Sequence, residues 1–117
     1  MTDELEQFRN RRARGNEALL DTDNLSIKRL MGLDKNVYDA GSLDTPTKEL
    51  LGLVASMVLR CDDCIDYHLE RCVEEGYDKA QLDEAMSVAL LVGGTIVIPH
   101  ARHAALNLQH LLAARET

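Results

Sequence analysis

The chain has 117 residues, a length that suits one compact domain and leaves little room for a second hydrophobic core. Its 13 lysines and arginines are outnumbered by 20 aspartates and glutamates, and the resulting net charge of −7 argues against a general affinity for nucleic acid or for an anionic membrane surface. The longest apolar run, residues 85–98, is interrupted by serine, glycine and threonine, so the sequence predicts no membrane span.

The N-terminus and the cysteine count indicate a compartment. The first residues, MTDELEQF, carry acids where a secretory signal carries positive charge, so we expect a cytoplasmic, reducing location. Three cysteines are an odd number, which argues against a structural disulfide framework and leaves metal binding or thiol chemistry. The one basic cluster, Arg9, Arg11, Arg12 and Arg14, is interpreted as a solvated helix face or a subunit contact.

Helical patterns follow one another from the N-terminus. Residues 4–20 are rich in helix formers, and residues 24–38 carry apolar side chains at helical spacing. A strong start signal comes next, with Asp44 or Thr45 as the cap and Pro46 at the first helical position. Three helices are therefore expected before residue 60.

The second half of the chain predicts further helices. Apolar residues at helical spacing continue to Gly76, which suits the left-handed position after a helix end. Asp78 and Gln81 have the spacing of a capping box at the start of the next helix. No alternating run of β-branched residues appears, so we predict a single all-α domain of five or six helices over residues 1–117.

The pair Gly93–Gly94 separates the last two predicted helices. A phosphate-binding loop is an alternative, but the pair lacks the lysine and the preceding strand of such a loop, so a helix–helix turn is favoured. Thr95 is expected to cap the last helix, which runs to about Ala114. The helices on both sides of the pair are apolar beyond a single stripe, which predicts self-association.

The segment RCDDCIDYHLERC, residues 60–72, contains the three cysteines. On a helix, Cys61, Cys64, His68 and Cys72 lie within an arc of roughly 80°. A Cys-x-x-Cys pair in a first helical turn can close a disulfide, and the unpaired N–H groups there favour a thiolate. His68 follows Cys64 by one turn, so its imidazole can accept the Cys64 proton. The negative charges of the two aspartates between the cysteines act against a thiolate.

Other interpretations of this segment stay open. Zinc could be held by Cys61, Cys64 and His68, with His100 or His103 as a fourth ligand, although the second cysteine pair of a structural zinc site is missing. The chain could also be an oligomeric scaffold with inert thiols. Packing as a small apolar residue is the favoured interpretation of the third cysteine, which has no partner at metal-ligand spacing beyond its own helix.

Four residues form the pattern E-x11-C-x-x-C-x3-H, which is followed by GGTIVIPHARHA; they are Glu49, Cys61, Cys64 and His68. On these residues, the region of about 45–107 resembles the alkylhydroperoxidase D-like branch of the carboxymuconolactone decarboxylase family. The resemblance implies an all-α domain that assembles into trimers or hexamers. It also implies a thiol-dependent peroxidase or disulfide reductase, for which we expect no cofactor and no metal.

The resemblance assigns a role to each residue of the pattern. Cys64 would attack a hydroperoxide or the disulfide of a partner protein, and Cys61 would supply a proton and then close a disulfide that an external dithiol reduces. His68 and Glu49 would form the proton relay, although on sequence alone Glu49 only complements the dipole of its helix. In the best-known peroxidases of this branch, a histidine often precedes the second cysteine. This chain has Asp63 there, which bears on the choice of substrate.

Glu49 gives a structural test. In one unbroken helix it would lie about 18 Å from Cys61, so the chain must reverse near residues 59–62 if the relay is to form. In an antiparallel helix pair, His68 would lie about 10 Å and Glu49 about 16 Å from the turn. A long side chain, the crossing of the helices or one water molecule could close that difference.

Overall fold

The structure, a computed structural model, describes residues 3–116, which form six α-helices and one short 3-10 helix. No strand occurs among these residues, so the predicted all-α fold of five or six helices is confirmed. The elements in chain order are α1 (Asp3–Leu20), α2 (Leu25–Val37), α3 (Thr45–Val58), α4 (Asp62–Glu74), α5 (Lys79–Gly93), η1 (Thr95–Val97) and α6 (Ile98–Glu116).

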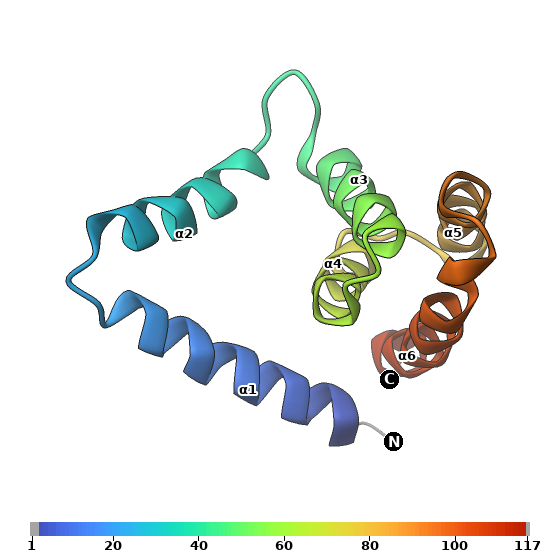
Figure 1. The fold of residues 1–117 in the computed structure, drawn as a ribbon. Coiled ribbons are helices and arrows are strands. Elements are labelled where there is room, and N and C mark those ends of the chain that lie inside the picture. Colours follow the sequence, from blue (N-terminus) through green and yellow to red (C-terminus); the bar gives the residue numbers. More distant parts are fainter. Residues whose placement is uncertain (1–2, 117) are drawn as a thin grey trace. The chain divides into compact units, whose positions relative to one another are not determined.

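The chain divides into two compact units. The described residues up to Thr45 form the first, in which α1 packs against α2, and the residues from Pro46 onward form the second. In the second unit, α4 and α5 both pack against α6, and α3 lies next to α4 (Figure 1). All four residues of the E-x11-C-x-x-C-x3-H pattern belong to the second unit. That residues 1–117 form a single domain stays a prediction.

The core of the second unit is made of apolar side chains on its four α-helices and on η1. These side chains are almost completely buried because each helix turns its apolar stripe away from water. They are Leu53, Met57, Ile65, Leu69, Leu82, Ala89, Val97, Ala104 and Leu108.

The predicted reversal between α3 and α4 is present, and Arg60 makes it. Its backbone has a φ of 60°, a left-handed conformation that non-glycine residues rarely adopt. The Arg60 N–H donates to the carbonyl of Met57 at 3.0 Å, and the Cys61 N–H donates to the carbonyl of Ser56 at 3.1 Å. These are the two hydrogen bonds of a Schellman helix end. They stop α3 and place Cys61 at the start of the next helix.

The other predicted helix ends agree with the structure in most cases. Gly76 has a φ of 102° after α4, and the Asp78–Gln81 capping box opens α5 with hydrogen bonds of 2.8 and 3.0 Å. Thr95 was expected to cap the last helix, and this prediction is wrong. Thr95 instead begins η1, which has no side-chain cap and in which the Val97 N–H donates to the Gly94 carbonyl at 3.0 Å.

Gly93 and Gly94 form the predicted helix–helix turn and not a phosphate loop. Gly94 has a φ of 83°, and a β-carbon added to Gly93 would lie 2.5 Å from Cγ2 of the fully buried Val97. The first constraint is conformational and the second is steric, so each glycine serves the turn between α5 and η1 for a different reason. Across the described part of the chain, no helix combines the length and the apolar character needed to cross a membrane.

Candidate active site

A disulfide joins Cys61 and Cys64 at the start of α4. Cys61 is the residue before the first helical position, with extended backbone angles, and its Sγ accepts a hydrogen bond from the Cys64 N–H at 3.3 Å. Cys61 is partly buried, whereas Cys64 is exposed. The pair therefore lies where the sequence predicts it, in the first turn of a helix, and its second cysteine is exposed in the single chain.

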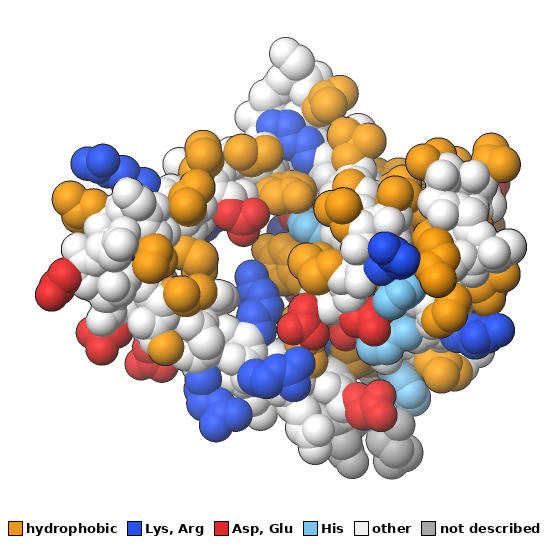
Figure 2. Space-filling view, in the orientation of Figure 1, with side chains coloured by type: hydrophobic (Ala, Val, Ile, Leu, Met, Phe, Trp, Pro, Cys, Tyr) orange, Lys and Arg blue, Asp and Glu red, His pale blue; other side chains and the backbone are white. Residues whose placement is uncertain are grey.

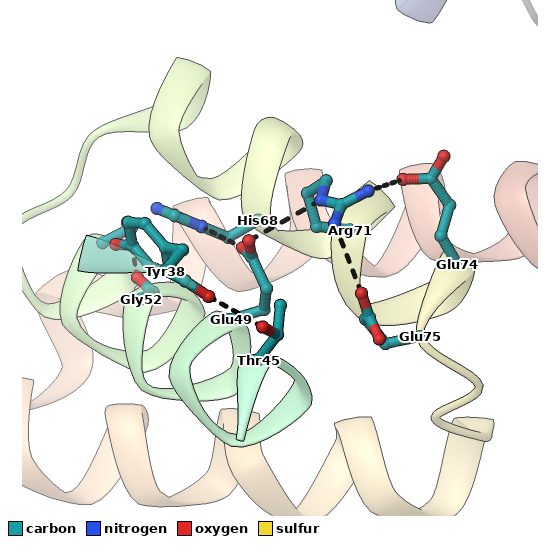
Figure 3. Close-up of polar contacts among 9 residues, drawn as sticks. Tyr38, Thr45, Glu49, Gly52, His68, Arg71, Glu74 and Glu75 are labelled. Carbon is teal, nitrogen blue, oxygen red and sulfur yellow. Dashed lines mark hydrogen bonds and ion pairs between the residues drawn. The ribbon is translucent and has the colours of Figure 1, made fainter. Parts of the chain in front are cut away.

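Glu49 of α3 reaches His68 of α4 directly. Its Oε1 lies 2.8 Å from Nδ1 of His68, and Figure 3 shows the two side chains pointing toward each other between the helices. The Glu49 residue is 2% exposed, and the His68 side chain is 11% exposed. The distance mismatch that the sequence suggested is closed by the two side chains themselves, without a bridging water.

This contact orients the imidazole ring. A carboxylate only accepts hydrogen bonds, so Nδ1 of His68 is the donor to Glu49 and carries the ring hydrogen. His68 lies one helical turn after Cys64, which puts both side chains on the same face of α4. The arrangement of a carboxylate, a histidine and a cysteine in this order suits the activation of a thiol.

Arg71 is a neighbour of this site that the sequence reasoning did not identify. Its Nε lies 3.6 Å from Oε2 of Glu49, and its other two guanidinium nitrogens pair with Glu74 at 2.9 Å and Glu75 at 3.2 Å (Figure 3). The signal in the sequence is its position three residues after His68, on the same helical face. In the sequence, however, Arg71 looks like an ordinary surface cation of a helix, because acids follow it three and four residues later.

Cys72 is fully buried, as the packing interpretation predicted. Burial raises the pKa of its thiol to about 12, and the negative charges of Glu49 and Glu75 add to this effect while Arg71 opposes it. A thiol with such a pKa is protonated at neutral pH and is a poor nucleophile.

A second polar network joins α4 to α6. Asp62 lies 2.7 Å from His100, and the buried Asp66 lies 2.8 Å from His103 and accepts a hydrogen bond from the Asn107 side chain at 2.6 Å. Figure 2 shows acidic and histidine side chains side by side over this region. Burial raises the pKa of Asp66, although its hydrogen bonds to Asn107 and His103 partly offset the effect.

The geometry does not assemble the zinc alternative. Within residues 3–116, no three histidine, cysteine, aspartate or glutamate side chains are close enough to hold a metal ion. Cys61 and Cys64 are joined to each other, and Nδ1 of His68 is taken by a carboxylate. His100 and His103, the two proposed additional ligands, pair with aspartates of α4 instead.

The chain is similar to proteins of a known family. The model of the carboxymuconolactone decarboxylase family matches residues 26–107. The chain is 32% identical over 74 residues to "uncharacterized protein 4 in cox locus" of Paracoccus denitrificans, a match that covers 63% of this chain and 67% of that protein. It is 33% identical over 64 residues to alkyl hydroperoxide reductase AhpD of Corynebacterium kroppenstedtii. That match covers 55% of this chain but only 37% of the reductase.

Two solved structures share the fold. One is a carboxymuconolactone decarboxylase family protein of Thermotoga maritima with a suggested role in antioxidative response. It is 50% identical, with a TM-score of 0.90 over 94% of this chain and 93% of that one. The other is the apo form of a carboxymuconolactone decarboxylase family protein of Legionella pneumophila, 19% identical with a TM-score of 0.84 over 93% of this chain and 97% of that one. At 19% identity, the second likeness concerns the fold alone.

Proposed function

The chain belongs to the carboxymuconolactone decarboxylase family, and from this premise we propose that it is a thiol-dependent peroxidase whose Cys61–Cys64 couple is reset by an external dithiol. The observation that carries the proposal is the 2.8 Å contact between the buried Glu49 and His68, one helical turn from Cys64. The likeness to an alkyl hydroperoxide reductase supports it.

The first half of the reaction oxidises Cys64. Nε2 of His68 accepts the proton of the Cys64 thiol, and the thiolate attacks one oxygen of a hydroperoxide, ROOH. A sulfur–oxygen bond forms while the oxygen–oxygen bond breaks, which leaves a sulfenic acid on Cys64 and an alkoxide. The imidazolium returns its proton to the alkoxide, so the product is the alcohol ROH. Glu49 stabilises the imidazolium while it holds the proton.

The second half resets the couple. The Cys61 thiol attacks the sulfenic sulfur, a disulfide forms, and the thiol proton leaves with the hydroxyl group as water. An external dithiol then reduces the disulfide by thiol–disulfide exchange and is itself oxidised to a disulfide. The same couple could reduce a disulfide of a partner protein, because exchange also begins with a thiolate attack on sulfur.

The setting of this chemistry is also a proposal. A reducing cytoplasm would supply the dithiol, and we place the protein there. We further propose that it works as a homo-oligomer, a trimer or a hexamer. Apolar side chains of α5 and η1 that face water in the single chain support self-association, among them Val88, Leu91, Val92 and Ile96.

Steady-state turnover tests the proposed function. tert-Butyl hydroperoxide consumption with dithiothreitol is measured for the wild type, Cys64→Ser and Cys61→Ser, and Cys72→Ala serves as the matched control. Both serine variants are expected to fall to the rate of dithiothreitol alone, while the control stays near the wild type. Equal turnover in all four proteins would end the thiol-enzyme proposal. Reduction of an aromatic disulfide by the wild type, but not by Cys64→Ser, in the absence of peroxide turnover would instead identify a disulfide reductase.

A further inference from the structure

The two carboxylate oxygens of Glu49 have different partners. Oε1 accepts from His68 at 2.8 Å, and Oε2 faces Nε of Arg71 at 3.6 Å. We propose that Arg71 is a positioning residue that holds the Glu49 carboxylate against Nδ1 of His68 and thereby keeps the ring hydrogen on that nitrogen. This inference rests on the proposed thiol chemistry, because the hydrogen-free Nε2 is the atom that exchanges a proton with Cys64.

Burial makes a charged partner for Glu49 necessary. Its side chain is 3% exposed, and an ionised carboxylate removed from water costs several kcal/mol unless charge and hydrogen bonds compensate. His68 supplies a hydrogen bond to one carboxylate oxygen. The structure places the guanidinium of Arg71, a permanent cation, beside the second oxygen.

The Arg71 guanidinium is itself held in place. Nη1 donates to Glu74 at 2.9 Å and Nη2 donates to Glu75 at 3.2 Å, so all three guanidinium nitrogens face carboxylates. Exposed ion pairs three and four residues apart on a helix are worth little to stability. Their effect here is to orient the guanidinium of Arg71, whose side chain is 35% exposed, so that Nε points at Glu49 (Figure 3).

Loss of Arg71 would alter the state of the histidine. Without the contact to Nε of Arg71, the Glu49 carboxylate can turn away from His68, and Nδ1 then loses the acceptor that fixes its hydrogen. The ring hydrogen would then move to Nε2. The nitrogen that should take the Cys64 proton would be occupied.

Nitrogen NMR of the reduced full-length protein tests this inference. Two-bond proton–nitrogen correlation in slightly alkaline buffer shows which nitrogen of a neutral ring carries the hydrogen, and a His68→Gln spectrum assigns the His68 signals. We expect Nδ1–H in the wild type and in Arg71→Lys, which keeps the charge, but Nε2–H in Arg71→Met. Lys79→Met is the matched control, because it removes the exposed Lys79–Asp83 ion pair of α5 and should leave the His68 signals unchanged.

Steady-state turnover of the same variants is the second measurement. Arg71→Met should lower kcat for tert-butyl hydroperoxide about 10- to 100-fold with little change in KM, and Arg71→Lys should recover most of that loss. Wild-type signals for His68 in Arg71→Met would overturn the proposal. If Arg71→Met does not fold, Nε2–H in Arg71→Lys would overturn it.

The failure of the proposed function can be told apart from the failure of this inference. If Cys64→Ser leaves peroxide turnover unchanged, the proposed function is wrong, and the NMR spectra alone then decide whether Arg71 fixes the hydrogen of His68. If turnover depends on Cys64 but Arg71→Met changes neither the turnover nor the Nδ1–H signal, the proposed role of Arg71 is wrong and the proposed function is unaffected.

Discussion

The environment of each thiol decides what it can do. Cys64 is exposed in the first turn of α4, where the positive end of the helix dipole favours negative charge. Cys72, two turns further along, is sealed among apolar side chains and near the negative charge of Glu49. Three cysteines within one short segment therefore have different chemistry.

Alkylation measures this difference. Iodoacetamide added to the native, reduced protein is expected to modify Cys61 and Cys64 but not Cys72, because burial raises the Cys72 pKa to about 12 and leaves almost no thiolate at neutral pH. Intact-mass spectrometry should show two adducts in native buffer and three in denaturant. The Cys72→Ala protein should show two adducts under both conditions. Modification of native Cys72 as fast as Cys64 would contradict this account.

Part of the site could be predicted residue by residue, and part could not. Spacing alone places Cys61, Cys64 and His68 on one helical face, because the helix repeat fixes local neighbours. Glu49 entered through the family resemblance, since its distance from His68 depends on how α3 crosses α4. The structure confirms that contact, whereas its catalytic role stays a proposal. Arg71 was missed because its contact with Glu49 depends on the same crossing.

At the scale of elements, α4 and α6 are joined by a polar network that the sequence analysis did not predict. Asp62 and Asp66 are four residues apart, and His100, His103 and Asn107 follow the same helical spacing. Which acid meets which histidine depends on the register between the two helices, and only tertiary packing sets that register. The histidines considered as zinc ligands therefore proved to be partners of aspartates.

Asp66 predicts a pH effect on stability. Burial raises its pKa in the folded protein above the ordinary value of 3.8, so the folded chain binds this proton more tightly than the unfolded chain. The contribution to stability is therefore fully present below pH 3.8 and is lost as the pH rises through the higher folded pKa. Urea denaturation across this interval should show that the free energy of unfolding falls less with rising pH in Asp66→Asn than in the wild type.

An exposed acid supplies the control for Asp66. Asp83→Asn removes a carboxylate from the surface of α5, and its pH dependence over the same interval should follow the wild type more closely. If the free energy of unfolding of Asp66→Asn and that of the wild type change with pH in the same way, the buried Asp66 carboxyl group does not cause the pH dependence of stability.

The turn between α5 and η1 predicts a steric effect. Gly93→Ala should lower the free energy of unfolding by about 1–3 kcal/mol, because its β-carbon would collide with the buried Val97. Gly15→Ala on α1 is the matched control, since no atom lies within 4 Å of its added β-carbon, and it should raise stability by about 0.5–1 kcal/mol. Urea denaturation compares the two. Equal effects would mean that Gly93 is not needed for close packing.

At the scale of the whole molecule, the helices were predictable because their apolar periodicity and end signals are local. Periodicity and end signals predicted five or six helices, of which the structure has six, and the predicted capping box at Asp78 is present. The error at Thr95 has a physical cause. The tight turn at Gly94 leads into a 3-10 segment that buries Val97, and this tertiary demand overrides the local capping preference of threonine.

Exposed apolar side chains favour self-association, and the family resemblance proposes a trimer or a hexamer. Light scattering coupled to size-exclusion chromatography should give the mass of a trimer or hexamer. Leu91→Lys should shift the protein toward smaller species, because Leu91 is 86% exposed in the single chain and a lysine there resists burial. Glu84→Gln, an equal change of charge at an exposed position of α5, should leave the mass unchanged. A monomeric wild type would contradict the proposed assembly.

In the proposed reaction, Cys64 takes the peroxide oxygen and Cys61 closes the disulfide. One equivalent of tert-butyl hydroperoxide is added to reduced Cys61→Ser in the presence of dimedone, which traps sulfenic acids, and peptide mass spectrometry locates the adduct. The account predicts a stoichiometric adduct on Cys64, and none on Cys61 when the experiment is repeated with Cys64→Ser. An unmodified Cys64 in Cys61→Ser, or an equal adduct on Cys61 in Cys64→Ser, would contradict it.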